Sequence, residues 1–428
     1  MPNSVDGGAR VQKGSALSVL VLNNFCHAQG GASRVAIDEA VGLAHSGARV
    51  VFLGAVGPVC PELQHAPLEV VCLEQRELAT AGGRAGVLLQ GLWNAKAYRA
   101  VQEVLSRLDP DNTVVHLHGF TQALSTSPIR CAVDGGYASV YTLHDFFLAC
   151  PNGAFFDYQA REPCTRQALS LDCITTQCDK RNYAQKLYRV ARSSIQRSIG
   201  HLPAGVKDYI ALSRRSAEVL RPYLPADAKI HSVSNPIEVA KREPVDVARN
   251  TRVVAVGRLD PEKGIDVLAR AARQTGTPLT LIGDGPLREQ LAAGESCRVT
   301  GWIPREAVLA ELEAARCLVF PSLWYETYGL AVSEAAARGI PAIVSDISAA
   351  AERVRDGMTG WHARAGDVED LARRLELVKD DATVERAGRA AYEQYWSNPP
   401  TLAEHIAKLT DVYSEILARR RPASAGEG

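Results

Sequence analysis

The feature that most constrains the fold of this chain is an alternation of short apolar runs with helical segments, which starts over once. From Leu17 the run "LSVLVLNNF" is followed by a Gly-Gly turn, by "SRVAIDEAVGLAHSGA" with helical periodicity, and by the strand-like "RVVFLG". This order predicts βαβ units and a mostly parallel sheet. The alternation starts over after Asn235-Pro236 with "RVVAVGRLD". The sequence therefore predicts an α/β protein with two doubly wound domains.

The length of 428 residues leaves room for two or three domains, each with its own core. We place a first domain at 15–235, a second at 236–395, and C-terminal helices at 396–420 that pack back across the junction. In open parallel sheets, ligands bind outside the C-terminal strand ends, so the cleft between the domains is the expected active site. The tail "PASAGEG" is expected to be disordered.

The charge balance excludes some partners. The chain has 48 Lys and Arg against 48 Asp and Glu, so no overall field favours nucleic acid or an anionic membrane. No apolar run approaches the ~20 residues of a membrane helix, and the N-terminus lacks the basic start and apolar core of a secretory signal. We therefore expect a cytoplasmic protein that does not bind nucleic acid, and ten cysteines that are reduced thiols rather than a disulfide framework.

Two cations follow the first strand of the second domain. Arg258 and Lys263 in "GRLDPEKG" come directly after "RVVAV", so they are expected at the C-terminal edge of the sheet. Cations beside a helix N-terminus form an anion site, because the unpaired helix amides and the helix dipole add to their charge. A solvated turn, in which the cations pair with Asp260 or Glu262, is an equally weighted alternative.

Two glutamates, Glu326 and Glu334, bracket seven residues in "YETYGLAVSEA". Glu326 precedes Gly329, where a helix is expected to start, and Glu334 lies inside that helix. Ionised carboxylates accept hydrogen bonds from hydroxyl groups. Carboxylates on either side of a diphosphate would suit a nucleotide sugar, with Glu326 on the transferred sugar and Glu334 on the ribose. The alternative is a surface loop followed by an ordinary amphipathic helix.

The combination of these motifs is typical of a known family. "GRLDPEKG", followed about sixty residues later by "PSLWYETYGLAVSEAAARGIPAIVSD", resembles the donor-binding half of retaining glycosyltransferases of family 4, which have the GT-B fold. "GGASRVAIDEAVGLAHSGARVVFLG", "VVHLHG" and "YTLHD" are similar to the family's N-terminal half, so the resemblance spans nearly the whole chain. It implies two Rossmann-like domains that face each other across a cleft. The linker reads "SNPIE" where the family more often has Asn-Gly-Ile-Asp, so hinge closure is expected to differ.

The resemblance implies a role for each motif residue. Arg258 and Lys263 would hold the diphosphate, and Glu334 would contact the ribose. Glu326, on the donor sugar, and His144, near the donor sugar and the acceptor, are the expected catalytic residues. The other expected donor-binding residues are Gly30, Gly31, Trp302, Ile303, Tyr328, Gly329 and Leu330, with the Trp302-Ile303 pair against the base and the Gly329 and Leu330 amides on the β-phosphate. His116 and His118 are further candidates, although a histidine at a strand end is more often structural.

The function implied by the resemblance is the transfer of a sugar from a UDP- or GDP-linked donor to a glycan or lipid-linked acceptor, in cell-surface polysaccharide biosynthesis. The family retains the anomeric configuration by same-face attack, and stabilisation of the departing diphosphate is then the main electrostatic task. No catalytic metal is expected. A nucleotide-sugar epimerase or a phosphorylase of GT-B-like fold, and a non-catalytic nucleotide-sugar sensor, are the alternatives.

Four cysteines, Cys150, Cys164, Cys173 and Cys178, fall in an insertion at 150–180, where a metal would order a loop with little apolar content. Only the last pair has a spacing typical of zinc knuckles. A structural Zn2+ or, second, an iron–sulfur cluster is as well supported as free or partly buried thiols. The basic, amphipathic "DKRNYAQKLYRVARSSIQRSIG" that follows is either a solvated helix face or a surface that approaches anionic lipid at the inner membrane face.

Overall fold

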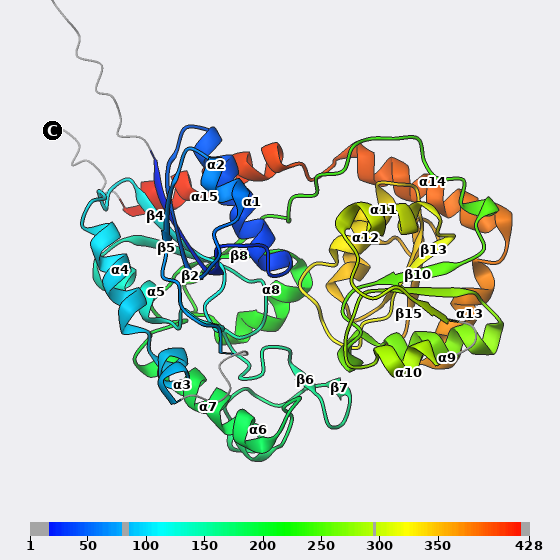
Figure 1. The fold of residues 1–428 in the computed structure, drawn as a ribbon, viewed down its shortest axis with the longest axis horizontal. Helices are drawn as coiled ribbons and strands as arrows, with labels where there is room; N and C mark the ends of the chain where they lie inside the picture. Colours follow the sequence, from blue (N-terminus) through cyan, green and yellow to red (C-terminus); the bar gives the residue numbers. More distant parts are fainter. Residues whose placement is uncertain (1–16, 79–84, 294–296, 421–428) are drawn as a thin grey trace, which may run out of the picture.

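The computed structural model describes residues 17–78, 85–293 and 297–420 (Figure 1). Two lobes lie side by side, and the chain runs through the first lobe, into the second and back to the first. The expectation of a disordered tail at 422–428 lies outside the described residues.

The first domain is built on a seven-stranded sheet in the order β3-β2-β1-β4-β5-β8-β9, and every neighbouring pair is parallel. Its central strands are apolar without alternation, because helices cover both faces of a parallel sheet. The strands are β1 (Ser18–Phe25), β2 (Arg49–Val56), β3 (Glu69–Cys72), β4 (Thr113–Leu117), β5 (Ala138–Thr142), β8 (Asp208–Ala211) and β9 (Lys229–Ser232).

The helices of this domain form two layers. One layer packs on the sheet through the last helix of the chain, which contacts the first helix, β4 and β5, so the C-terminus returns to the first lobe (Figure 1). The helices are α1 (Gly31–His45), α2 (Pro61–His65), α3 (Ala85–Leu92), α4 (Ala95–Leu105), α5 (Ser127–Asp134), α8 (Arg214–Leu220) with the 3-10 turn Arg221–Tyr223, and α15 (Leu402–Arg420).

The second domain has a six-stranded sheet in the order β12-β11-β10-β13-β14-β15, again parallel throughout. Its strands are β10 (Val253–Val256), β11 (Leu279–Ile282), β12 (Cys297–Val299), β13 (Cys317–Phe320), β14 (Ala342–Ser345) and β15 (Gly360–Ala363). Its helices are α9 (Ile265–Thr275), α10 (Arg288–Ala292), α11 (Arg305–Glu313), α12 (Leu330–Ala336), α13 (Val368–Leu377) and α14 (Asp381–Ser397), with 3-10 turns Val247–Arg249, Pro261–Lys263 and Ala349–Arg353.

Both sheets have the same switch point. The strand order changes direction between β1 and β4 in the first sheet and between β10 and β13 in the second. Ligands of doubly wound sheets bind in the crevice outside the carboxyl ends of the strands at such a point. The prediction of two Rossmann-like domains with the GT-B arrangement is confirmed, and the topology directs attention to the loops after these four strands.

The insertion at 150–180 spans the two domains. It contains the short hairpin β6 (Phe156–Asp157) and β7 (Glu162–Pro163) and the helix α6 (Leu171–Thr175). The side chains of Ala154 and Phe156 are buried in the core of the second domain. Arg161 also reaches α9, where its Nη2 donates to both carboxylate oxygens of Asp266 at 2.9 and 2.8 Å. The insertion therefore contacts the second domain and not only the first.

Helix α7 (Tyr183–Ser198) follows the insertion and turns its basic residues inward. Lys186 and Arg192 are buried, and Arg189 pairs with Asp179 at 3.1 Å. Large apolar side chains are exposed on this helix and on the neighbouring α3 and α6, namely Leu89, Leu171, Tyr183, Leu187 and Ile199 just after α7. Among the described helices, none combines the length and apolar character that crossing a membrane requires.

Candidate functional site

The loop after β13 holds Glu326 in a strained and buried position. Its φ of 50° lies in the left-handed region that side-chain-bearing residues rarely adopt, and only 8% of the residue is exposed. Its Oε1 accepts hydrogen bonds from Lys263 Nζ at 2.6 Å, Ser322 Oγ at 2.7 Å and Trp324 Nε1 at 2.8 Å. The structure thus joins the loops after β10 and β13 through an ion pair between two of the expected site residues.

His144 of the first domain meets the same loop. It follows β5, and its backbone carbonyl accepts a hydrogen bond from Thr327 Oγ1 at 3.0 Å. Burial lowers the pKa of His144 to about 3. The imidazole is therefore neutral, and it lies where the two domains meet, beside the segment that carries Glu326.

The first turns of two helices face each other across the domain junction. A Cβ atom placed on Gly31, at the start of α1, would lie 3.4 Å from Leu330 Cδ1, at the start of α12. The residue before each helix has a positive φ, 120° at Gly30 and 93° at Gly329. A Cβ at Gly329 would also come within 2.8 Å of Ala350 Cβ, so that position requires glycine. Four of the expected donor-binding residues are thereby brought to one place.

Arg258 lies in the loop after β10 and is exposed to solvent. Its side chain is 68% exposed, and its Nη1 lies 2.7 Å from Oδ2 of the buried Asp260. The expected alternative, an ion pair with Asp260, is present in the structure. The other oxygen of Asp260 accepts a hydrogen bond from Lys180 Nζ at 2.5 Å. Lys180, which the sequence did not indicate, comes from the end of the insertion, so both domains bring a cation to this loop.

Glu334 is paired with a second arginine. Its Oε1 lies 2.9 Å from Nη2 of Arg305, the first residue of α11. Burial raises the pKa of Glu334, and the charge of Arg305 opposes this rise. Trp302, three residues before Arg305, is 78% exposed, while Ile303 packs against the core of the second domain. The ion pair with Arg305 therefore joins the expected ribose contact, Glu334, to the segment that carries the expected base contacts.

The side chain of Tyr328 makes contacts within the protein. Its ring is buried, and the guanidinium of Arg353 lies 3.5 Å from its centre. Its hydroxyl donates to the backbone carbonyl of Asn235, in the linker between the domains, at 3.2 Å. The side chain of this expected donor-binding residue thus ties the linker to the second domain.

A cluster of buried histidines backs His144. His118 Nδ1 lies 2.9 Å from His144 Nε2, and His116 lies between the hydroxyl groups of Tyr413 and Thr142, each at 2.6 Å. Glu39, His116 and His118 form the one group in the described parts of the chain with three potential metal-ligand atoms within 4.8 Å of one another. No sequence motif marked Glu39, because it lies inside an ordinary amphipathic helix.

Two of the four cysteines of the insertion lie beside a buried lysine. Lys186 Nζ lies 3.0 Å from Cys178 Sγ and 3.5 Å from Cys173 Sγ. The Cys150 thiol donates to Asn152 Oδ1 at 3.0 Å. Cys164 Sγ lies 3.9 Å from Arg166 Nη1. Within the described residues, no three of these sulfurs lie within 4.8 Å of one another, and no disulfide joins them.

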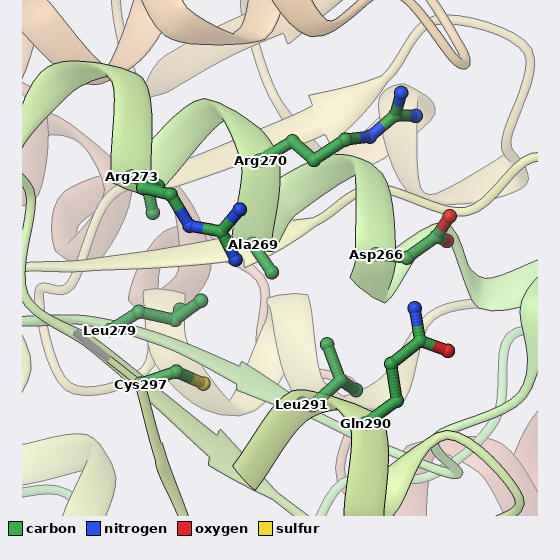
Figure 2. A pocket seen from close by; sticks show the side chains of 9 residues that line it. Asp266, Ala269, Arg270, Arg273, Leu279, Gln290, Leu291 and Cys297 are labelled. Carbon is green, nitrogen blue, oxygen red and sulfur yellow. The ribbon is translucent and has the colours of Figure 1, made fainter. Parts of the chain in front are cut away.

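A cavity of about 250 Å³ lies apart from this site (Figure 2). It is lined by residues of α9, β11, α10 and β12, and Asp266, Arg270 and Arg273 supply its charged groups. The loops after β10 and β13 do not line it. We therefore place the candidate site at the domain junction, where the sequence motifs meet.

Comparisons with known proteins bear on the family of the chain. The profile "Glycosyltransferase Family 4" matches residues 29–241, and "Glycosyl transferases group 1" matches residues 238–394. The glycogen synthase of Mycobacterium tuberculosis is 34% identical over 42% of this chain and 47% of its own length. A D-inositol 3-phosphate glycosyltransferase of Nocardia farcinica is 30% identical over 68% of this chain and 64% of its own length. The chain spans about half the length, or less, of the first curated relatives that it matches.

Solved structures share the fold. The sucrose-phosphate synthase of Thermosynechococcus elongatus superposes with a TM-score of 0.67 at 18% identity and covers 94% of this chain and 100% of its own. HepE of Anabaena, solved in complex with UDP, has a TM-score of 0.61 at 17% identity and covers 93% of this chain and 100% of its own. These similarities extend over both domains.

Proposed function

The chain belongs to glycosyltransferase family 4 and has the GT-B fold, and from this premise we propose that it is a retaining glycosyltransferase. It moves a sugar from a nucleoside-diphosphate sugar, UDP- or GDP-linked, to a glycan or lipid-linked acceptor in cell-surface polysaccharide biosynthesis. The observation that carries the proposal is the 2.6 Å pair of Lys263 and Glu326 at the switch point of the second sheet, beside His144 of the first.

The donor is proposed to lie along the junction of the two domains. Its diphosphate sits between Arg258, Lys263 and the amides at Gly329 and Leu330, since cations and helix N-termini favour phosphate. Gly31 approaches it from the first domain. Two observations support this placement. A Cβ atom placed on Gly31 would lie 3.4 Å from Leu330 Cδ1, and the Arg258 side chain is exposed.

The two ends of the donor are assigned to the two glutamates. Glu334 accepts hydrogen bonds from the ribose, which requires Arg305 to release or share the carboxylate, and Trp302 lies against the base. Glu326 contacts the transferred sugar. A carboxylate that is already fixed by three donors needs little reorganisation when a sugar hydroxyl arrives, which favours this assignment.

The proposed reaction proceeds on one face of the sugar. The acceptor oxygen attacks the anomeric carbon, the bond from that carbon to the phosphate oxygen breaks, and the acceptor proton passes to the departing phosphate. Arg258 and Lys263 stabilise the charge that develops on the diphosphate. His144, as a neutral imidazole, contacts the donor sugar and the acceptor. No catalytic metal takes part in these steps.

The domain assignment is part of the proposal. Residues 15–235 face the acceptor, 236–395 hold the donor, and 396–420 join them, which is supported by the packing of α15 on the first sheet. For a lipid-linked acceptor, the surface of α3, α6 and α7 with its exposed Leu171, Tyr183 and Leu187 would touch the inner membrane face. Vesicles that contain anionic lipid should then bind the protein; absence of binding even at low salt would remove this part.

The cysteines of the insertion are proposed to hold a structural metal, with Zn2+ favoured over an iron–sulfur cluster. The supporting observation is Lys186, a fully buried lysine whose side-chain contacts are sulfurs, because an ammonium stabilises metal-bound thiolates. Protein purified without chelator should carry stoichiometric metal, and Cys178→Ser should lose it. A metal-free preparation that folds and reacts normally would contradict the assignment.

The function is tested by a thermal-shift and hydrolysis screen against UDP-, GDP-, ADP- and dTDP-linked sugars. A ligand that binds only the folded protein raises its melting temperature, and the rise grows with the logarithm of the ligand concentration above Kd. One donor should stabilise the protein and be slowly hydrolysed. If none of these donors binds while other ligands do, the donor site is wrong although the fold stands.

A further inference from the structure

A buried chain of polar side chains runs from the last helix of the protein to His144. His405, on α15, lies 2.9 Å from Oε1 of Glu39, on α1. The other carboxylate oxygen, Oε2, lies 3.2 Å from Nε2 of His118, which follows β4. His118 Nδ1 in turn lies 2.9 Å from Nε2 of His144. Three of these side chains are almost completely shielded from solvent, so their charges and protons are strongly constrained.

The charge of His405 follows from its two partners. Its Nε2 faces the Glu39 carboxylate, and its Nδ1 lies 2.7 Å from the backbone carbonyl of Ser234. Both partners only accept hydrogen bonds, so both ring nitrogens carry protons and the ring is an imidazolium. Burial alone would lower the pKa of His405 and raise that of Glu39. The contacts with each other, and with His118, instead raise the pKa of His405 and hold that of Glu39 well below its usual range.

The protonation of His118 follows from this pair. One carboxylate neutralises one imidazolium, and a second buried cation without its own counter-charge would be strongly unfavourable. In a neutral His118 ring the negative charge of Glu39, whose Oε2 lies 3.2 Å from Nε2, favours the proton on Nε2. The Nδ1 atom has only a lone pair, so His144 must donate to it from Nε2.

We propose that Glu39 and His118 are positioning residues that hold His144 as the Nε2–H tautomer and thereby leave its Nδ1 as a hydrogen-bond acceptor for a sugar hydroxyl. Nδ1 lies across the ring from Nε2 and so faces away from His118. The role of His144 in turnover rests on the proposed function, whereas the assignment of its Nε2–H tautomer does not. The acceptor state of a histidine is set by what its other nitrogen binds.

A metal bound by Glu39, His116 and His118 would use the same atoms. His116 is already occupied without it, because its two nitrogens lie 2.6 Å from the hydroxyl groups of Tyr413 and Thr142. Both nitrogens of His405 and Nδ1 of His118 also have a hydrogen-bond partner, while His118 Nε2 and Glu39 Oε2 face each other at 3.2 Å without an aligned hydrogen bond.

The test uses the full chain labelled with 15N-histidine, in which the nitrogen shifts report each tautomer. In the wild type, His144 should be the Nε2–H form. Glu39→Gln should populate both forms and lower kcat roughly tenfold to a hundredfold, as loss of an orienting partner does, with the KM for the donor unchanged. Because this variant leaves His405 without its counter-charge, Glu39→Gln/His405→Gln is measured beside it, and the same loss is expected.

Tyr413→Phe is the matched control. It removes a hydrogen bond from the same buried cluster, to His116, and should leave the His144 tautomer and kcat as in the wild type. A wild-type His144 in the Nδ1–H form, or a His144 signal unchanged in both Glu39 variants, overturns the proposal even if the protein transfers sugar. If the protein turns over no donor but the tautomer follows Glu39, the proposed function fails and the positioning of His144 stands.

Discussion

Replacing Glu326 by glutamine removes one charge and keeps the shape of the site. The amide oxygen can still accept from Ser322 and Trp324, so the main loss is the charge of the 2.6 Å contact with Lys263. The side chains of Glu326 and Lys263 are 11% and 19% exposed, so solvent screens the pair weakly. A charged hydrogen bond contributes about 1 kcal/mol more than a neutral one. The variant should therefore lose about 1 kcal/mol of unfolding free energy, or about 2–4 °C in melting temperature.

The effect on turnover should be larger than the effect on stability. If the carboxylate acts on the donor sugar in the transition state, Glu326→Gln should lower kcat by about two orders of magnitude, which is about 2.7 kcal/mol of barrier. The KM for the donor should change little, because Arg258 and Lys263 remain to hold the diphosphate. The loss in kcat is therefore too large to follow from the small loss of stability.

The assay is steady-state release of nucleoside diphosphate with the donor found by the screen, at a temperature well below both melting transitions. Glu313→Gln is the matched control, because Glu313 also pairs with arginine, at 3.4 Å from Arg242, but lies outside the cleft. It should keep the wild-type kcat. A kcat near the wild-type value in Glu326→Gln would refute the role of this carboxylate, and an equal loss in both variants would show a general effect of charge removal.

Three further outcomes are expected. Arg258→Ala and Lys263→Ala should each weaken donor binding and turnover, measured as a higher KM and a lower kcat; near wild-type values in both would remove the diphosphate assignment. Lys180→Ala should leave the fold intact and change the donor KM several-fold, because Asp260 loses one of its two cations, and the steady-state assay would measure it. In the Glu39–His405 pair, the raised pKa of His405 and the lowered pKa of Glu39 give full stability between their ordinary values of 4.5 and 6.5; stability is lost as pH rises through the pKa of His405 or falls through that of Glu39. The free energy of unfolding, measured with urea at a series of pH values, should be highest in this range. An unfolding free energy that does not vary with pH would contradict the prediction.

Patterns that are local in the sequence predicted the fold well. The apolar runs at Ser18–Phe25 and Val253–Val256 are buried in continuous parallel sheets, as their composition indicates, and the restart after Asn235 marks the second sheet. The pairing of Lys263 with Glu326 follows from motif positions, since both loops leave central strands of one sheet.

What the sequence did not indicate depends on contacts between distant segments. Lys180 meets Asp260 across 80 positions, and Glu39 meets His405 across 366. The local sequence does not indicate that Glu39 is buried while the adjacent Asp38 is partly exposed. The sequence of helix α7 likewise predicts a basic surface. Amphipathicity shows that a helix has two faces, but it does not show that Lys186 contacts two cysteine sulfurs.

Through the insertion, the position of the loop that carries Asp260 depends on the cysteine cluster. Lys180 follows Cys178 by two residues, so whatever orders that cysteine also places the ammonium group at Asp260. The loop of Asp260 carries Arg258 on one side and Lys263 on the other, and Lys263 in turn fixes Glu326. A change at the thiols would therefore reach the proposed sugar-binding carboxylate through the Lys180–Asp260 pair, the short backbone segment from Asp260 to Lys263, and the Lys263–Glu326 pair. For this reason the loss of metal from Cys178→Ser should alter the donor KM in the same direction as Lys180→Ala, and equal KM values in Cys178→Ser and the wild type would show that the cluster acts on the fold alone.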